Sequence, residues 1–361
     1  MESIAAATFL EEDGNAYENA DAKVERRRLR DMYDPFQMSD ELFKKNFRLN
    51  KDAFKYVLDT FAEETQQSTL TSLSPLNRVV AALRFFAEGS YQHGVGTDYN
   101  VGMGQSTVSK SLSHFLEVMQ RKLCREWIKF DQSEEEKMQA EQEFYAKASF
   151  PGVIICVDGT HIKIVKPSEE GFLYYNRKGF YSINAILFYQ FNFTFQVCDN
   201  RMRIKSIDAR YPGCNHDSHV WGLSKLKSHM ERRYREGDAG YPLQPWLMTP
   251  YRSVTQGSPQ SNYSMRHSTT RNIVERTIGV LKNGFRCLLG ARELHYSPHK
   301  VSQVINVACA LQTICIYYKV EDLNASEFNF ESRQEEKEEQ SSDPDYTSIA
   351  NRIRDNILST F

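Results

Sequence analysis

Three acidic residues in this chain stand where a carboxylate could do chemistry. Asp158 follows the apolar run at residues 153–157, a pattern typical of a buried strand that carries an acid to the end of a sheet. Asp238 stands in a glycine-containing turn, and glycine lets the backbone come close to a ligand. Glu275 falls near the edge of the apolar face of a predicted helix. Together they form a candidate site with one acid on a strand, one in a turn and one on a helix.

The chemistry open to such a trio is metal-assisted phosphoryl transfer. Carboxylate oxygens are the ligands that hard divalent cations such as Mg²⁺ or Mn²⁺ prefer. Three carboxylates can hold two cations, one activating a water or a 3′-hydroxyl and the other stabilising the leaving oxygen. Each acid also has a plainer interpretation, as a turn former, a solvated helix residue or, for a fourth acid at Asp217, a helix N-cap.

Basic residues lie close in sequence to these acids and could hold backbone phosphates. We predict DNA contacts from Arg177, Lys178, Arg271, Arg276 and Lys282.

The part of the chain that precedes these acids has the pattern of helices. Apolar residues at three- and four-residue spacing predict a helix over 38–61, and Ser74-Pro75 predicts the start of another. A short segment and the turn at 100–104 then lead to a helix over 105–119. This order is the helix-turn-helix layout, with Ser106, Thr107 and Lys110 near the start of the recognition helix. A helical bundle that does not contact DNA remains the alternative.

Composition changes to a β-rich pattern after a predicted charged helix at 133–147. Strands are predicted at 153–157 continuing through 162–165, at 183–189, at 193–197 and at 203–208, and helices at 218–235, 269–283 and 300–319. Strands followed by helices favour an α/β or α+β domain with a central sheet.

Charge and cysteine usage narrow the class of protein. Residues 321–361 hold 11 acidic and 4 basic side chains, so this tail has a net charge of −7. The whole chain has a net charge of −2, and −2 minus −7 leaves +5 for the body, which suits a nucleic-acid partner. Seven scattered cysteines without a CxxC motif indicate reduced thiols in an intracellular protein. The sequence contains no apolar stretch of membrane-spanning length, so we expect no membrane partner.

Six short stretches, in order, give the chain a specific resemblance. They are Val157-Asp-Gly-Thr-His-Ile162, Tyr175-Asn-Arg-Lys-Gly-Phe180 with Ser182 and Asn184, Tyr211-Pro-Gly-Cys-Asn-His-Asp-Ser218, Gly237-Asp-Ala-Gly-Tyr-Pro242, Trp246-Leu-Met-Thr-Pro250, and Arg271-Asn-Ile-Val-Glu-Arg276 through Phe285-Arg286. In these stretches the chain resembles DDE endonucleases of the PIF/Harbinger transposase superfamily, of the Tnp4 type.

The resemblance implies an RNase H-like mixed sheet flanked by helices, with Asp158, Asp238 and Glu275 as catalytic acids and metal ligands. It also implies cleavage of DNA that depends on a divalent metal, Mg²⁺ or Mn²⁺, a separate Myb/SANT-like DNA-binding partner, and action in the nucleus. We expect the nucleus as the location, with the cytoplasm as a second one.

Two departures from the family pattern motivate an alternative function. An arginine-rich segment at 232–236 replaces the usual apolar strand before Asp238, and Gly284 replaces an arginine in the late turns of the Glu275 helix. Glycine there is expected to cost helix stability of about 1 kcal/mol. The alternative is a domesticated DNA-binding or regulatory protein that keeps the fold and the metal site but has lost cleavage. A phosphohydrolase of small substrates is disfavoured because such an enzyme has no use for a helix-turn-helix region.

The predicted organisation has five parts. They are a mobile N-terminus at 1–35, a helix-turn-helix-like helical domain at 36–125, a linker helix at 126–150, an RNase H-like nuclease domain at 151–320 and an acidic, disordered tail at 321–361.

Overall fold

The computed structural model describes most of the chain. The described residues are 20–65, 73–89, 92–98, 101–130, 133–191, 202–224, 227–228, 248, 250–251, 254–290, 293–320 and 344–359. Asp238, the arginine-rich segment before it and the strand predicted at 193–197 lie outside these residues.

Helices form the first part of the chain. They are α2 (Ala20–Met32), η1 (Pro35–Gln37), α3 (Asp40–Phe47), α4 (Lys51–Thr65), α5 (Pro75–Glu88), α6 (Gln92–Thr97), α7 (Gln105–Arg121), α8 (Leu123–Trp127) and α9 (Glu134–Ala148). A small sheet and further helices follow. They are β1 (Cys156–Lys163), η2 (Gly171–Tyr174), β2 (Ser182–Phe191), β3 (Met202–Pro212), α10 (Asp217–Gly222), α12 (Pro259–Gly284), η3 (Arg286–Leu288), α13 (Pro298–Tyr317) and α14 (Pro344–Leu358).

Local sequence signals explain where several helices begin and end. Ser74 caps α5 by accepting a hydrogen bond from the Asn77 amide at 3.2 Å, as its position before Pro75 predicted. The single helix predicted over 38–61 is wrong, because Arg48 adopts a left-handed conformation with φ of 62° and separates α3 from α4. Gly284 is the last residue of α12, so the cost expected for a glycine inside a helix does not apply there.

The sheet has three antiparallel strands in the order β1-β2-β3. Asp158 pairs with Leu187 and lies in the interior of β1, which continues to Lys163. The prediction that Asp158 ends a strand over 153–157 is therefore wrong, because the strand begins only at Cys156. The helix-rich chain with one small sheet fits an α+β fold, as the sequence pattern predicted.

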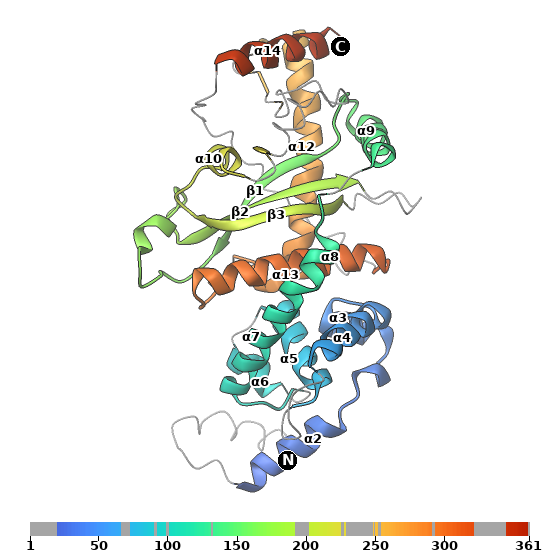
Figure 1. Ribbon diagram of the computed structural model, residues 1–361, viewed down its shortest axis with the longest axis vertical. Coiled ribbons are helices and arrows are strands. Elements are labelled where there is room, and N and C mark those ends of the chain that lie inside the picture. Colours follow the sequence, from blue (N-terminus) through green and yellow to red (C-terminus); the bar gives the residue numbers. More distant parts are fainter. Residues whose placement is uncertain are drawn as a thin grey trace.

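Different helices cover the two faces of the sheet (Figure 1). On one face α13 packs on β2 and β3, and residues such as Ile162 and Leu187 are buried there. The long helix α12 packs against the edge strand β1 and runs past the sheet from the level of α14 to that of α13. On the other face α10 places Val220 and Trp221 against Ile186 and Phe188 of β2. Because side chains alternate along a strand, neighbouring residues of β1 face these two environments in turn.

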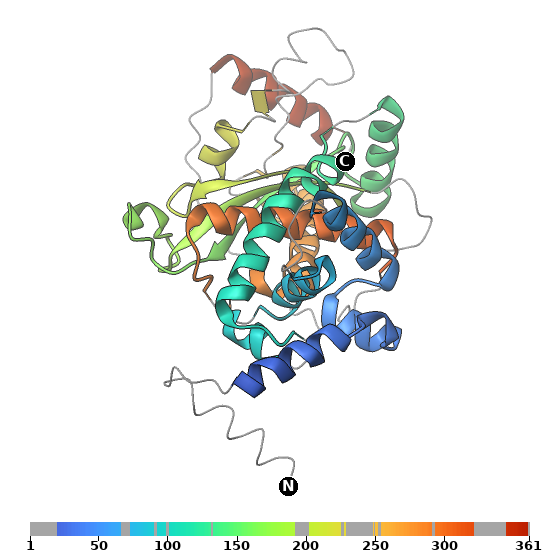
Figure 2. The same cartoon turned by 60° about the horizontal axis from the view of Figure 1, so that its bottom comes forward.

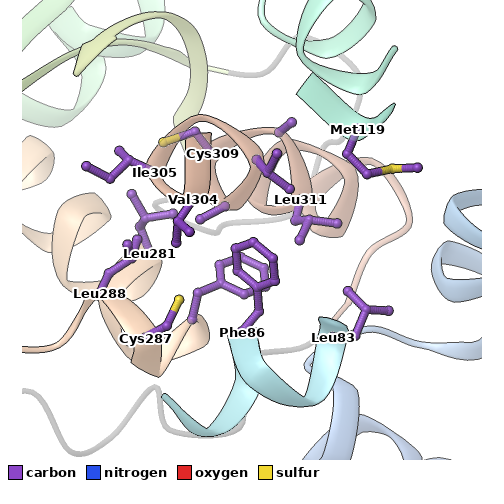
Figure 3. Close-up of a cluster of buried hydrophobic side chains, with 14 of the residues drawn as sticks. Leu83, Phe86, Met119, Leu281, Cys287, Leu288, Val304, Ile305, Cys309 and Leu311 are labelled. Atoms are coloured by element: carbon purple, nitrogen blue, oxygen red, sulfur yellow. The ribbon is translucent and has the colours of Figure 1, made fainter. Parts of the chain in front are cut away.

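One hydrophobic core joins the amino-terminal helices to the sheet region. Figure 3 shows Leu83 and Phe86 of α5 facing residues of α12, η3 and α13. At the end of α5, Gly89 has φ of 65°, and a Cβ there would lie 2.5 Å from the carbonyl oxygen of Arg286 in η3. The segments predicted as a helical domain and a nuclease domain therefore share a core, and their boundaries stay a prediction.

Helices α2 and α14 lie at opposite ends of the molecule (Figures 1 and 2). Helix α2 forms part of the segment predicted to be mobile, and α14 forms part of the tail predicted to be disordered. The mobility of the N-terminus and the disorder of the tail stay predictions. The tail helix docks through Tyr251, whose hydroxyl donates to Asp355 Oδ1 at 2.9 Å and whose ring lies 4.1 Å from the Arg354 guanidinium. None of the described helices has the length and apolar character needed to cross a membrane.

Candidate active site

Asp158 is a buried carboxylate in the middle of a strand. Its residue is 8% exposed, and it shares a strand face with Thr160 and Ile162, which are also buried. Burial, and after it the charge of Asp158, raises the pKa of the Cys156 thiol on the same strand face. Burying a carboxylate costs free energy unless it is paired, hydrogen-bonded or bound to a metal. A carboxylate at position 158 is therefore expected to serve a specific interaction.

Glu275 lies on the helix that covers β1. Its side chain is 21% exposed, and Arg271, one turn earlier, forms an ion pair with Glu275 Oε1 at 3.3 Å. Further along α12, Lys282 Nζ donates to the carbonyl oxygen of His161 in β1 at 3.2 Å. The structure thus brings the strand of Asp158 and the helix of Glu275 into contact, whereas Asp238 lies outside the described residues.

The two described acids are suitable donors for a divalent cation, but they do not by themselves complete a site. Mg²⁺ and Mn²⁺ favour carboxylate oxygens, and Asp158 and Glu275 come from two elements packed on each other. Within the part of the chain that the structure describes, no group of three metal-ligating side chains occurs. A third ligand would have to come from elsewhere, and Asp238 is the residue that the sequence predicts.

The basic residues predicted to contact DNA fall into three settings. Arg271 and Arg276 are exposed on α12, whereas the ammonium group of Lys282 is hydrogen-bonded to β1. Arg177 and Lys178 are exposed in the turn that leads from η2 to β2.

Asn176 organises the turn that carries Arg177 and Lys178. Its residue is 3% exposed, its Oδ1 accepts from the Lys178 amide at 2.9 Å, and its Nδ2 donates to Ser182 Oγ at 2.8 Å. Gly179 has φ of 81°, which a residue with a side chain rarely adopts. The two cations therefore project from a turn that is anchored to the start of β2.

The helices of the proposed helix-turn-helix occur in the expected order, as α5, α6 and α7. At the start of α7, Ser106 and Lys110 are exposed and Thr107 is half-buried. Farther along α7, Ser113 Oγ accepts a hydrogen bond from Lys300 Nζ of α13 at 2.8 Å. The start of α7 is open to a partner, and its later turns pack on the sheet region; DNA contact by α7 stays a prediction.

A polar cluster lies on the other face of the sheet, and the sequence names its residues Asn184 and Asp217 without predicting that they meet. Asn184 is fully buried in β2, and its Nδ2 donates to Asp217 Oδ1 at 2.7 Å. Asp217 is not the N-cap of α10, because His216 occupies that position. An asparagine inside the apolar run of β2 was the available signal, since a buried amide needs specific hydrogen-bond partners.

Comparisons with known proteins agree with this arrangement. The model of the DDE superfamily endonuclease family matches residues 157–312. The human protein named "Putative nuclease HARBI1" is 29% identical, over 98% of this chain and 98% of its own length. Its counterpart from Rattus norvegicus is 30% identical over 86% of this chain and 85% of its own. "Protein ALP1-like" from Arabidopsis thaliana is 26% identical over 76% of this chain and 70% of its own.

No solved structure matches the chain. The family match covers both described acids and the sheet that holds Asp158, and relatives with nuclease in their names align along nearly the whole chain. The chain belongs to the Harbinger-derived DDE nuclease family.

Proposed function

We propose that the protein is a divalent-metal-dependent DNA endonuclease whose ligands are Asp158, Asp238 and Glu275. One observation carries the proposal: a carboxylate that is 8% exposed lies in the middle of β1, on the strand that the Glu275 helix packs against. Membership of a DDE nuclease family supports the same reaction and implies a DNA substrate.

The chain's own residues have distinct tasks in this reaction. Burial of Asp158 keeps its carboxylate in one orientation, and the Arg271 ion pair orients the Glu275 carboxylate from one turn away. Divalent cations, when bound, supply a more acidic water and neutralise the charge that develops on the phosphate. Arg276 and the turn with Arg177 and Lys178 are exposed cations that would bind the phosphates on either side of the cleaved bond.

The exposed start of α7 extends this proposal to DNA binding. Ser106, Thr107 and Lys110 would contact duplex DNA, and a Myb/SANT-like protein would assist in site selection in the nucleus. Salt dependence tests the first part: Lys110→Gln should weaken DNA binding and make the salt dependence of log K less steep by about 1. Unchanged binding and slope would exclude Lys110 as a phosphate contact.

The alternative of a regulatory protein without cleavage is not favoured. The alternative was motivated by the arginine-rich segment at 232–236 and by Gly284. The second of these grounds is weakened because Gly284 lies at the end of α12, where glycine does not disturb the helix.

Nicking of supercoiled DNA by the purified full chain tests the proposal. We expect cleavage with Mg²⁺ or Mn²⁺ and none after chelation. Asp158→Asn, Asp238→Asn and Glu275→Gln should each lower the cleavage rate more than about 100-fold. Substituting a residue that only hydrogen-bonds to a metal ligand already lowers metal affinity or activity by about 10–100-fold.

Asp208→Asn is the matched control for Asp158→Asn. Asp208 lies in the same sheet, its side chain is 12% exposed, and it pairs with Arg210 at 2.6 Å rather than facing α12. Its variant should cleave at close to the normal rate. Wild-type protein without cleavage under any metal condition, or full activity in Asp158→Asn, would show that the proposal is wrong.

A further inference from the structure

On the face of the sheet opposite the Asp158 side chain, a buried polar side chain stands among apolar ones. Asn184 of β2 directs its Nδ2 to two acceptors, Asp217 Oδ1 at 2.7 Å and the carbonyl oxygen of Asn215 at 3.0 Å. Both acceptors belong to the loop that leads from β3 into α10. The buried amide therefore fixes this loop onto the sheet.

Asp217 lies against the backbone of the residue that follows Asp158. A Cβ placed on Gly159 would lie 2.2 Å from Asp217 Oδ1, 2.4 Å from its Cγ and 2.7 Å from Oδ2. All three distances are far shorter than a real van der Waals contact. An alanine at position 159 would therefore force the Asp217 carboxylate or the strand to shift.

The same close packing extends along the loop. A Cβ on Gly213 would lie 2.2 Å from Ser182 Oγ, and Ser182 Oγ is also within 3.0 Å of His161 Nδ1. Ser182 in turn receives the hydrogen bond from Asn176, which organises the turn that carries Arg177 and Lys178. The loop, the catalytic strand and the basic turn are thus connected by polar side chains on one face of the sheet.

A helix-capping role does not explain Asp217. Asp217 is the first residue of α10, and the N-cap position belongs to His216. A half-buried aspartate that accepts a hydrogen bond from a buried amide, and that lies where a Cβ on the opposing glycine would stand, indicates a contact with a geometric purpose.

We propose that Asp217 is a positioning residue for Asp158. Its carboxylate accepts the hydrogen bond from Asn184 and packs against Gly159. This contact fixes the position of β1 relative to the loop before α10. Since Asp158 directly precedes Gly159, the contact also fixes the position of the Asp158 carboxylate. Because metal–oxygen distances tolerate only about 0.2 Å, a small displacement of β1 weakens metal binding at the opposite face. This inference rests on the proposed metal-dependent function.

The first test compares three substitutions in the full chain by Mn²⁺ titration, following the rise in melting temperature, and by nicking kinetics. Asp217→Ala should raise the half-saturating Mn²⁺ concentration about 10-fold or more and lower kcat similarly, with KM for DNA changed less than about twofold. Asp217→Asn keeps an oxygen for Asn184 and should restore most of both values. Cys214→Ala, at an exposed position of the same loop, should match the wild type.

A purely structural role would give a different result. If Asp217→Ala lowers the melting temperature but leaves the Mn²⁺ midpoint and kcat unchanged, the positioning role is excluded. Should Asp217→Ala fail to fold, Asp217→Ser provides the same comparison, because the shorter hydroxyl cannot reach Asn184.

The second test needs no metal and no cleavage. Gly159→Ala should lower the melting temperature strongly when Asp217 is present and much less in the Asp217→Ala background, where the carboxylate is gone. Additive effects would show that the two residues do not press on each other and would overturn the proposal.

The two proposals can fail separately. Wild-type protein that binds Mn²⁺ without nicking DNA would overturn cleavage, while the Mn²⁺ midpoints would still decide the role of Asp217. Wild-type protein that neither binds Mn²⁺ nor nicks DNA would overturn both.

Discussion

At the scale of single residues, two cations of α12 have different surroundings. Lys282 donates a hydrogen bond to the His161 carbonyl oxygen at 3.2 Å and is half-buried, whereas Arg276 is exposed. Both lie on the Glu275 helix, and their sequence context predicted DNA contact for each. In the structure, the Lys282 hydrogen bond joins α12 to the strand that carries Asp158.

We therefore expect the two cations to respond differently to substitution. Lys282→Met keeps the apolar stem but removes the donor, and should lower the free energy of unfolding by about 1 kcal/mol in urea titrations. Arg276→Gln should leave that free energy within about 0.5 kcal/mol and weaken DNA binding in a salt-dependent way. A Lys282→Met protein with normal stability and weak DNA binding would instead identify Lys282 as a phosphate contact.

At the scale of elements, a histidine marks the packing of α7 on α5. Arg78 Nη1 lies 2.9 Å from His114 Nδ1, and the Phe61 ring contacts the imidazole edge-on at 5.2 Å between centroids. Because arginine can only donate, Nδ1 must accept, which requires the neutral imidazole. Burial first, and then the charge of Arg78, lower the pKa of His114 below its ordinary 6.5.

This lowered pKa predicts a loss of stability in acid. The unfolded chain protonates His114 near pH 6.5, while the folded chain does so only at lower pH. The unfolded state therefore binds more protons in that interval, and the contribution of His114 to stability is complete above pH 6.5 and declines as pH falls. His114→Asn, which offers an oxygen in place of Nδ1, should remove the decline.

Urea unfolding of both proteins at several pH values measures the effect. The difference in unfolding free energy between wild type and His114→Asn should shrink in acid, and other titrating groups cancel because both proteins contain them. A difference that does not vary with pH would mean that His114 titrates alike in the folded and unfolded chains.

How far the sequence predicts an element depends on how local its cause is. The start of α5 was predictable because Ser74 and Pro75 set it directly, and the strands around Asp158 and Asn184 followed from apolar runs. The break between α3 and α4 at Arg48, and the start of β1 at Cys156 rather than Val153, could not be predicted. Both depend on packing and not on a turn residue in the sequence. Contacts such as that between Lys282 and His161, 121 positions apart, carry no signal in one sequence.

At the scale of the whole molecule, the amino-terminal helices are packed as part of the nuclease region. Phe86 of α5 is fully buried, and its ring centroid lies 6.1 Å from that of Phe285 and 6.3 Å from that of Phe115. Phe285 directly follows α12, so this cluster joins α5 and α7 to the Glu275 helix. Such a core favours cooperative unfolding of both regions.

Phe86→Ala should test this cooperativity. We expect the free energy of unfolding to fall by about 3–5 kcal/mol, with amides of α5 and β2 losing hydrogen-exchange protection together. Leu42→Ala, at a position that is 46% exposed, should change stability by no more than about 0.5 kcal/mol. Loss of protection confined to α3–α7 would instead indicate two independently folding domains.

Helix α12 has a further consequence for how this family can vary. Its 26 residues extend over about 39 Å, with α14 and Tyr251 near one end and η3 and α5 at the other. Glu275 lies between these two contacts, so its position depends on how both ends of α12 are packed. If the proposed metal site exists, substitutions far from the carboxylates, in the tail helix or at the end of α5, should therefore change the spacing between its ligands without replacing any of them.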